Sequence, residues 1–498
     1  MIHAPGAGWL GAAADGLTNA PVGGRRSVAA GSGPLLTAGT AAAERRPPAP
    51  VASGMRRLLA RLRRGRWGTS LLLCAGLFTV YSLNAREIGA GDTVPATLLP
   101  VAILRGDGLA LNRFAAMWPN DLPWYVVDKQ GQIISRYPLA PGIFAVPFTA
   151  PQMLVRDLLS THWDQGGLLL FNTLVMGKTS ASLIAALTGV AIFQLLRALG
   201  LERVALLTAL FAGLGSTLYA VAAQALWQHG PAALSLTLAL ILLLPERIGR
   251  ARLFAAGLAV GTLACIRPPD VTLAVPISAW VVWRYRRDAL WFAPGPVLLF
   301  AAMLATNYRY FGSAGGGYTE MSPLILKMHG VDGYWSSDIL GGALGTLFSP
   351  SHGLFIFSPW MALALLCLPA TATSIGQWPV LRAALWALVP FFAVLSSFST
   401  WWGGWSFGPR YSTDVVPLFA VLLGFALDWS HRHLRPMLYA LLAAGVFSIA
   451  VEVIGAFCFP SSWNSTPSNV NVAHERLWDW RDSELTRCLR EGPHRGGW

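Results

Sequence analysis

Apolar runs of about 17 to 25 residues alternate along this chain with short polar segments, and such a run is long enough for an α-helix to cross a bilayer. The pattern therefore predicts an all-α polytopic membrane protein with about eleven transmembrane helices. The predicted spans lie near residues 68–84, 173–196, 203–223, 227–245, 251–267, 270–284, 289–309, 353–371, 379–399, 413–430 and 435–457.

The arginines between these runs predict the orientation of the chain. With the N-terminus inside, the loops expected to face the cytoplasm are rich in arginine, whereas the short loops on the other side are poor in it. We therefore expect a cytoplasmic N-terminus and an extracytoplasmic C-terminus. The arginines concerned are Arg197, Arg203, Arg247, Arg250, Arg252, Arg284, Arg286, Arg287, Arg382, Arg432 and Arg435.

The same pattern divides the chain into three parts. Residues 1–66 are expected to form a disordered, basic cytoplasmic tail. Within it, Met55 would make a natural start of translation. Residues 67–459 form the transmembrane domain, and residues 85–172 are its long first extracytoplasmic loop. Residues 460–498 form a polar extracytoplasmic tail.

Three segments outside the predicted spans carry further expectations. Residues 139–159 are apolar but contain three prolines, which favours an interfacial or re-entrant segment over a full span. The stretch HERLWDWRDSELTR in the tail predicts an amphipathic helix that could dock a partner. Cys458 and Cys488 both face the predicted oxidising side, so they either form a disulfide or stay free.

Composition supports the membrane assignment and excludes a soluble protein. The chain is 54% hydrophobic and only 12% charged, against about 25% charged residues in soluble domains. The net charge of +13 does not predict nucleic-acid binding, because the basic residues lie in short runs between apolar segments. Arginine dominates over lysine and alanine and glycine are abundant, which hints at a bacterial inner (cytoplasmic) membrane and the cell envelope.

Polar clusters from distant parts of the chain fall on the extracytoplasmic side of this topology. Because lipid-facing surfaces hold such groups only at a cost, we expect them to converge at a functional site. The clusters are the first loop, Gln228 and His229, the turn 267–270, residues 307–318, residues 349–352 and residues 401–414.

Asp92, in the sequence GAGDTVPA, is the predicted catalytic residue, either as a general base or, alternatively, as a mere N-cap of a helix at 93–104. Arg267 either reaches lipid headgroups or binds an anionic ligand. In WWGGWSFGPRYSTD, an aromatic belt accounts for the tryptophans, whereas the glycines beside Arg410 and Asp414 favour phosphate binding.

Three further residues are weaker candidates for binding a lipid phosphate. His229 and His352 each lie where an apolar run begins near the outer surface, where a structural hydrogen bond is the alternative role. Lys178 either extends outward to the headgroups or contributes to phosphate binding. The chain contains no HExxH, CxxC or P-loop motif, so the energy for a reaction must come from the substrate itself.

These residues resemble the GT-C superfamily of integral-membrane glycosyltransferases, which includes the protein O-mannosyltransferase and aminoarabinose transferase families. The resemblance covers roughly residues 67–460. It rests on Asp92, an amphipathic 93–117 region with short interfacial helices, and the stretches RYPLAPGIFAVPF (which contains Tyr137), GLAVGTLACIRPPDVTLAVP, NYRYFGSAGGGY, SHGLFIFSPW and WWGGWSFGPRY.

The resemblance implies an inverting transferase that moves a sugar from a polyprenyl-phosphate donor to a glycan, lipid or protein acceptor. Asp92 would be the base, and Arg267 and Arg410 would hold the lipid phosphate together with Lys178, Tyr137, His229, His352 and Asp414. Many relatives have an Asp-Glu pair where Thr93 follows Asp92 here. No cofactor is firmly implied, and a divalent metal held by Asp92 and Glu87 stays open.

Two other classes of function remain as alternatives. A transporter or flippase for a lipid-linked sugar would need polar groups near the middle of the membrane. A non-catalytic membrane subunit would use its outer loops to bind a partner.

Overall fold

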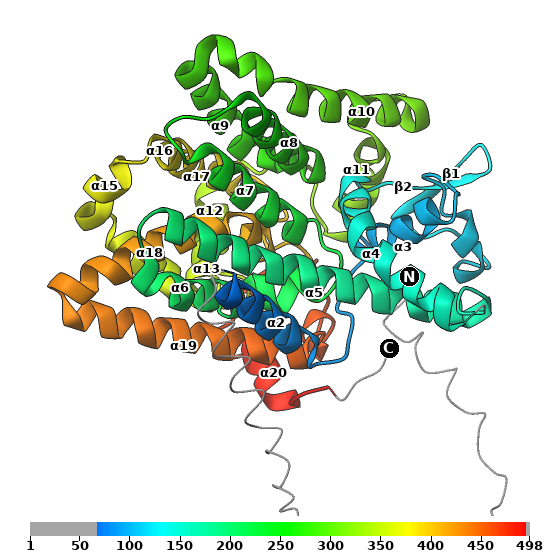
Figure 1. Ribbon diagram of the computed structural model, residues 1–498. Helices are drawn as coiled ribbons and strands as arrows, with labels where there is room; N and C mark the ends of the chain where they lie inside the picture. The colour runs from blue at the N-terminus through cyan, green and yellow to red at the C-terminus, as the bar shows by residue number, and fades with distance from the viewer. Residues whose placement is uncertain (1–66, 161, 495–498) are drawn as a thin grey trace, which may run out of the picture. The chain divides into compact units, whose positions relative to one another are not determined.

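The computed structural model describes residues 67–160 and 162–494, so the tail predicted for residues 1–66 lies outside the described residues. Apart from residues 67–69, the described chain belongs to one compact unit, which is mostly helical (Figure 1). Its helices are α2 (Gly68–Ser82), α3 (Thr93–Leu104), α4 (Ala140–Leu159), α5 (Gly166–Ala198), α6 (Glu202–Leu214), α7 (His229–Leu243), α8 (Arg250–Ile266), α9 (Val271–Tyr285), α10 (Pro294–Phe311), α11 (Gly317–Met328), α12 (Ile339–Phe348), α13 (Leu354–Phe357), α14 (Pro359–Leu366), α15 (Leu368–Gly376), α16 (Pro379–Trp386), α17 (Leu388–Ser396), α18 (Val416–His433), α19 (Arg435–Cys458) and α20 (Glu484–Glu491).

Four helical segments are long and apolar enough to cross a membrane, and six are if two bent pairs each count as one span. The chain is therefore a membrane protein by composition and helix length, but the predicted count of about eleven spans is not confirmed. Helices form at each predicted run, yet many are too short. The four segments are Gly166–Ala198, Pro379–Ser396, Arg410–His433 and Arg435–Cys458.

Breaks inside the apolar runs account for this shortfall. The predicted span at 353–371 is divided into α13, α14 and α15, and α14 and α15 meet at a bend of 72°. The segment that contains α9 meets α10 at 79°. Because proline lacks a backbone N–H and clashes with the preceding turn, Pro359 begins α14 rather than continuing α13.

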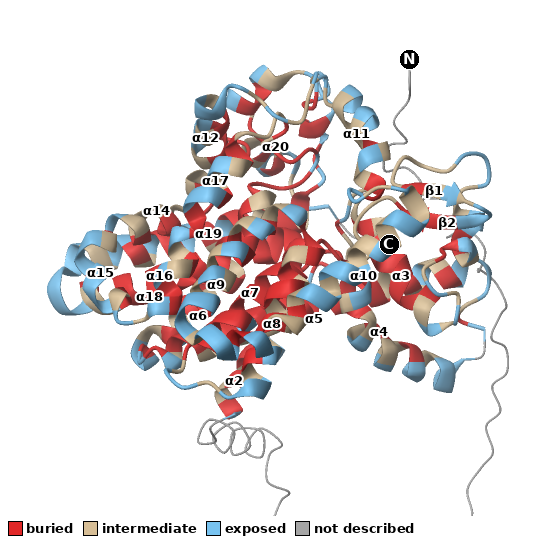
Figure 2. Cartoon of the chain, turned by 90° about the horizontal axis from the view of Figure 1, so that it is seen from above, coloured by how far each residue is buried: buried red, intermediate tan, exposed pale blue. Residues whose placement is uncertain are grey.

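The core lies where α5, α7 and α8 pack against one another, and buried residues are concentrated along these helices in Figure 2. Small residues allow α8 and α10 to approach closely: a Cβ added to Gly295 would lie 2.3 Å from the backbone carbon of Gly257. α18 also lies in the core. In the segment Arg410–His433, which contains α18, 89% of the most apolar 18-residue stretch is buried within the protein.

The first loop folds differently from its prediction in two respects. α3 is not amphipathic, because nine of its residues are buried where it packs against α4 and α5. A two-stranded antiparallel hairpin, β1 (Val126–Lys129) and β2 (Gln132–Ser135), interrupts the expected all-helical loop. Its two turn residues, Gln130 and Gly131, have φ values of 57° and 78°, as the tightest hairpin turns require.

α4 agrees with its prediction in part. It is not among the helices that meet the span criteria, but it runs as one continuous helix through Pro147 and Pro151. The turn predicted at 267–270 is present as a short 3-10 turn, Pro268–Asp270, between α8 and α9.

The C-terminal segment packs onto the body instead of presenting a docking helix. The predicted amphipathic helix is wrong: its residues form a 3-10 turn, His474–Trp478, then an extended stretch, then α20. Cys458 at the end of α19 and Cys488 in α20 form a disulfide. The two cysteines are 30 positions apart in sequence, and the residues between them are therefore closed into a loop on the body of the protein.

Candidate functional site

Asp92 and Arg410 form an ion pair although 318 residues separate them in sequence. Arg410 Nη1 donates to Asp92 Oδ2 over 3.1 Å, and the two side chains are 13% and 12% exposed. Asp92 Oδ1 and Arg410 Nε are buried and have no hydrogen-bond partner among the described residues. Each member of the pair thus keeps one polar atom available for a ligand.

The carboxylate of Asp92 does not cap α3, although Asp92 occupies the N-cap position. Its neighbour Thr93 takes over local hydrogen bonding, because Thr93 Oγ1 accepts from the backbone N–H of Ala90 over 3.0 Å. Asp92 is thus the N-cap residue by position, as the alternative role predicted, but its side chain makes no capping hydrogen bond and contacts Arg410 instead.

Arg410 is held between two aromatic rings. Its guanidinium carbon lies 4.8 Å from the ring centroid of Trp227 and 5.2 Å from that of Tyr411. The preceding loop comes very close to it, since a Cβ added to Gly403 would lie 3.0 Å from Arg410 Nε. Gly403 also has a φ of +82°, so only glycine fits this position without strain.

Tyr137, in the first loop, packs against other aromatic side chains. The ring of Tyr137 lies 5.7 Å from that of Tyr318 and 5.8 Å from that of Trp124. Burial raises the pKa of Tyr137 well above its usual value, and the negative charge of Asp92 raises it further. Tyr137, predicted as a binding residue, therefore lies within electrostatic reach of Asp92 as a neutral phenol.

A second charged cluster surrounds Asp414, at the 3-10 turn that leads into α18. Asp414 Oδ1 lies 2.9 Å from His229 Nδ1, and Asp414 Oδ2 accepts from Arg267 Nη1. Arg267 also lies 3.5 Å from Asp270 and donates to the carbonyl oxygen of Tyr411 over 3.3 Å. All four charged side chains are at most 5% exposed.

The two clusters are adjacent through Tyr411. The guanidinium of Arg267 lies 4.9 Å from the Tyr411 ring that also contacts Arg410. The structure thus brings together Asp92, Arg410, Arg267, His229 and Asp414, as their shared side of the membrane predicted. Arg267, however, directs its charge to buried carboxylates, whereas Arg410 keeps access to solvent.

His352 and Lys178 form their hydrogen bonds with groups other than Asp92 and Arg410. His352 Nε2 lies 3.2 Å from the carbonyl oxygen of Ser406, and burial lowers the pKa of His352 to about 3, so this imidazole is neutral. Lys178 does not extend outward to the headgroups: it is 4% exposed and donates to Gln224 Oε1 over 2.5 Å and to the carbonyl oxygen of Ala223 over 3.0 Å.

Sequence reasoning missed a buried polar network beside Lys178. Asn84 Nδ2 donates both to Gln224 Oε1 and to the carbonyl oxygen of Ala456, at 2.6 and 2.8 Å. Glu452, one turn before Ala456 in α19, is fully buried. A glutamate inside the apolar run 435–457 was the available signal, since an ionisable residue in a span is rare without a role.

Glu87 faces this network rather than Asp92. Desolvation of its carboxylate raises the pKa of Glu87 to about 7, and the positive charge of Lys178 acts in the opposite direction. Glu87 and Asp92 belong to none of the clusters of three or more metal-ligating side chains found in the described part of the chain. A divalent metal held by Glu87 and Asp92 therefore stays a prediction.

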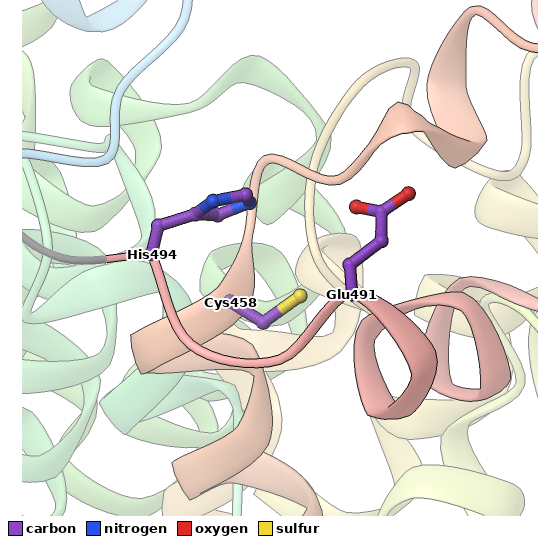
Figure 3. A group of neighbouring side chains, drawn as sticks. All are labelled: Cys458, Glu491 and His494. Atoms are coloured by element: carbon purple, nitrogen blue, oxygen red, sulfur yellow. The ribbon is translucent and has the colours of Figure 1, made fainter.

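Cys458, Glu491 and His494 do gather closely enough to suggest a metal site (Figure 3). Cys458, however, is bonded to Cys488 and has no thiolate to offer. Glu491 Oε2 accepts from the backbone N–H of Ser462 over 3.1 Å, and the backbone N–H of His494 donates to the carbonyl oxygen of Phe457 over 2.9 Å. These contacts fix the chain end onto α19, so the cluster is structural.

The Asp92–Arg410 pair combines a proton acceptor with a cation that can bind an anion, both within reach of solvent. Such a pair can remove a proton from a hydroxyl group and stabilise a phosphate that departs. Comparisons of the chain with models of protein families, with curated proteins and with solved structures found no match in any of the three.

Proposed function

We propose that this protein is an inverting glycosyltransferase that moves a sugar from a polyprenyl-phosphate donor to an acceptor hydroxyl group at the extracytoplasmic face of a bacterial inner membrane. The observation that carries the proposal is the contact between Asp92 and Arg410, each of which keeps an unpaired polar atom. The finer topology, with about eleven spans and a GT-C-like scaffold, belongs to the same proposal.

The reaction uses the two members of the pair in different roles. Asp92 accepts the proton of the acceptor hydroxyl as the acceptor oxygen bonds to the anomeric carbon of the sugar. The bond from that carbon to the phosphate oxygen breaks on the opposite face, and polyprenyl phosphate leaves with the electron pair. Arg410 stabilises the negative charge that develops on this phosphate. General-base help of this kind contributes about 10²–10⁴-fold.

The surrounding groups suit a donor that is both lipid and sugar. Arg410 is fixed between Trp227 and Tyr411, so it loses little side-chain freedom when a phosphate binds. Arg267 is already paired with Asp414 and Asp270, and its proposed role is to hold the loop that carries Tyr411 and Arg410.

The principal test is Asp92→Asn in the full chain, with transfer of radiolabelled sugar from polyprenyl-phosphate donors to membrane acceptors as the readout. We expect transfer to fall at least about 10²-fold while donor binding stays near normal. Asp107→Asn is a matched control, because Asp107 pairs with Arg113 over 2.7 Å in the same loop. Retained transfer in Asp92→Asn would remove Asp92 from the mechanism.

Arg410 is tested by donor affinity rather than by rate alone. Arg410→Ala should weaken binding of the polyprenyl-phosphate sugar, and Arg410→Lys should restore part of it because the charge is kept without the planar fork. An unchanged donor affinity in Arg410→Ala would contradict the assignment of Arg410 to the phosphate.

The buried network of Lys178, Gln224 and Asn84, together with the buried carboxylate of Glu452, favours a second candidate, a flippase for the same lipid-linked sugar. Such proteins use polar groups inside the membrane, and Lys178 and Glu452 both lie within candidate spans. In proteoliposomes, flipping of a labelled donor that Glu452→Gln abolishes and Asp92→Asn leaves intact would favour this function over transfer.

A further inference from the structure

A pocket of about 160 Å³ lies beside the loop that leads to Arg410. Its walls come from the start of α12, from the segment 398–402 and from the 3-10 turn His474–Trp478. Trp401 forms one corner, with its ring 5.9 Å from that of Trp402 at 86° and 6.0 Å from that of Trp478 at 54°. The indole rings therefore present faces in more than one direction.

The polar groups of this pocket are the carboxylate of Asp338, the imidazole of His474, two serine hydroxyl groups and the indole N–H groups. Asp338 Oδ1 caps α12 by accepting from the backbone N–H of Gly341 over 2.8 Å, which leaves Oδ2 at the pocket. His474 Nε2 lies 2.8 and 3.0 Å from the carbonyl oxygens of Asn471 and His329, so Nε2 is a hydrogen-bond donor there. The described residues that line the pocket include no lysine and no arginine.

This lining selects one class of ligand. A phosphate or carboxylate would need a cation, which the described lining residues do not supply, and an acyl chain would make no use of the carboxylate, hydroxyl and indole N–H groups there. A neutral ring with hydroxyl groups on its edge and C–H bonds on its faces satisfies both the acceptors and the indole rings. The volume is below the roughly 300–1,000 Å³ of pockets for drug-sized ligands, which favours a single ring.

We propose that this pocket binds one neutral monosaccharide unit, with the sugar's C–H groups against Trp401 and Trp478 and its hydroxyl groups hydrogen-bonded to Asp338 and His474. Trp402 is followed directly by Gly403, which adjoins Arg410. The pocket therefore serves as the subsite for a saccharide acceptor, an assignment that rests on the proposed transferase function.

The test is saturation-transfer NMR on the full chain in a detergent without a sugar headgroup, with methyl α-glucoside, α-mannoside, α-galactoside and β-arabinoside as probes. We expect at least one glycoside to show saturation of its ring protons. Trp478→Ala should weaken this binding at least about tenfold. Trp480→Ala is the matched control, because Trp480 is 62% exposed and does not line the pocket.

Asp338→Ser provides a second variant that keeps the helix cap and removes the carboxylate. It should weaken glycoside binding without unfolding α12. The proposal would be overturned if no glycoside showed saturation with the unmodified chain. It would also be overturned if Trp478→Ala and Asp338→Ser both bound the glycoside as tightly as the unmodified chain. If the unmodified chain binds a glycoside but transfers no sugar, the assignment of the pocket is upheld and the transferase function is contradicted.

Discussion

Two pairs of a carboxylate and an arginine lie on either side of Tyr411, and they differ in how fully each is enclosed. Asp414 and Arg267 are almost completely buried and are joined by His229 and Asp270, so their charges are met within the protein. Asp92 and Arg410 form a single contact, are each more than a tenth exposed, and retain unpaired atoms. The first pair has the character of a structural support and the second that of a working site.

This contrast follows from the cost of burying charge. A buried ion pair is tolerated when further hydrogen bonds satisfy it, and removing one member leaves the other uncompensated. A partly exposed pair contributes less to stability, because water competes for both members. We therefore expect a large loss of stability when the Asp414–Arg267 pair is broken and a small one when the Asp92–Arg410 pair is broken.

The largest effect is expected for Asp414→Ala, which leaves Arg267 buried with Asp270 and without its closest partner. We expect a loss of about 3–5 kcal/mol in the free energy of unfolding, seen as a large fall in Tm in detergent. Asp428→Ala in the same helical segment is the control, because the partner of Asp428, Arg432, is 60% exposed. Equal Tm values for the two variants would contradict the contrast.

The disulfide should contribute a somewhat smaller amount. Replacing Cys458 and Cys488 by serine releases a loop of 30 residues, for which the loss of stability is about 3 kcal/mol. Limited proteolysis should then cut the C-terminal segment first. Adding reductant should reproduce this result in the unmodified chain and in the Cys74→Ser control, since Cys74 is free, and should change nothing further in the double variant.

A pH-dependent effect, smaller than the preceding ones for each pH unit, is expected at His352. Its pKa falls from the ordinary 6.5 to about 3 on folding because of burial, so the unfolded chain takes up a proton at a higher pH than the folded one. Stability is therefore complete above pH 6.5 and declines as the pH falls toward 3, by at most about 1.4 kcal/mol per pH unit. His352→Gln should flatten the Tm profile in this window, whereas a change at the exposed His431 should not.

The smallest effect on stability is expected for Asp92→Asn. Its pair with Arg410 is partly exposed, so the change in the free energy of unfolding should stay within about 1 kcal/mol. The same variant has the largest expected effect on transfer. A loss of stability as large as that of Asp414→Ala would show that the two pairs do not differ in kind.

The sequence predicted where the polar groups meet better than how they pair. The predicted topology assigned the polar residues at the ends of apolar runs to one side of the membrane, which is why Asp92 and Arg410 could be placed together despite the distance along the chain. Asp270 and the packing of Tyr411 determine that Arg410, and not Arg267, is the partly exposed cation. These contacts form only when the helices pack against one another.

The fold shows the same division. Apolar length indicated where helices form, but it did not indicate that Pro359 would divide one run or that α3 would be buried on most of its surface. The C-terminal segment was mistaken for a free amphipathic helix, because its pattern of charges does not show that Trp463 and Leu477 become buried. Burial between distant segments leaves little trace in local sequence.

The contacts of the C-terminal segment also set an order of events during biosynthesis. Glu484 accepts from the backbone N–H of Gly408 over 3.0 Å, and Asn471 accepts from Trp402 Nε1 over 3.0 Å, so residues made after all the candidate spans complete the loop that carries Arg410. A nascent chain still emerging from the ribosome lacks these contacts. The loop that carries Arg410 therefore reaches its final set of contacts only after the last segment of the chain has been synthesised and has packed against it.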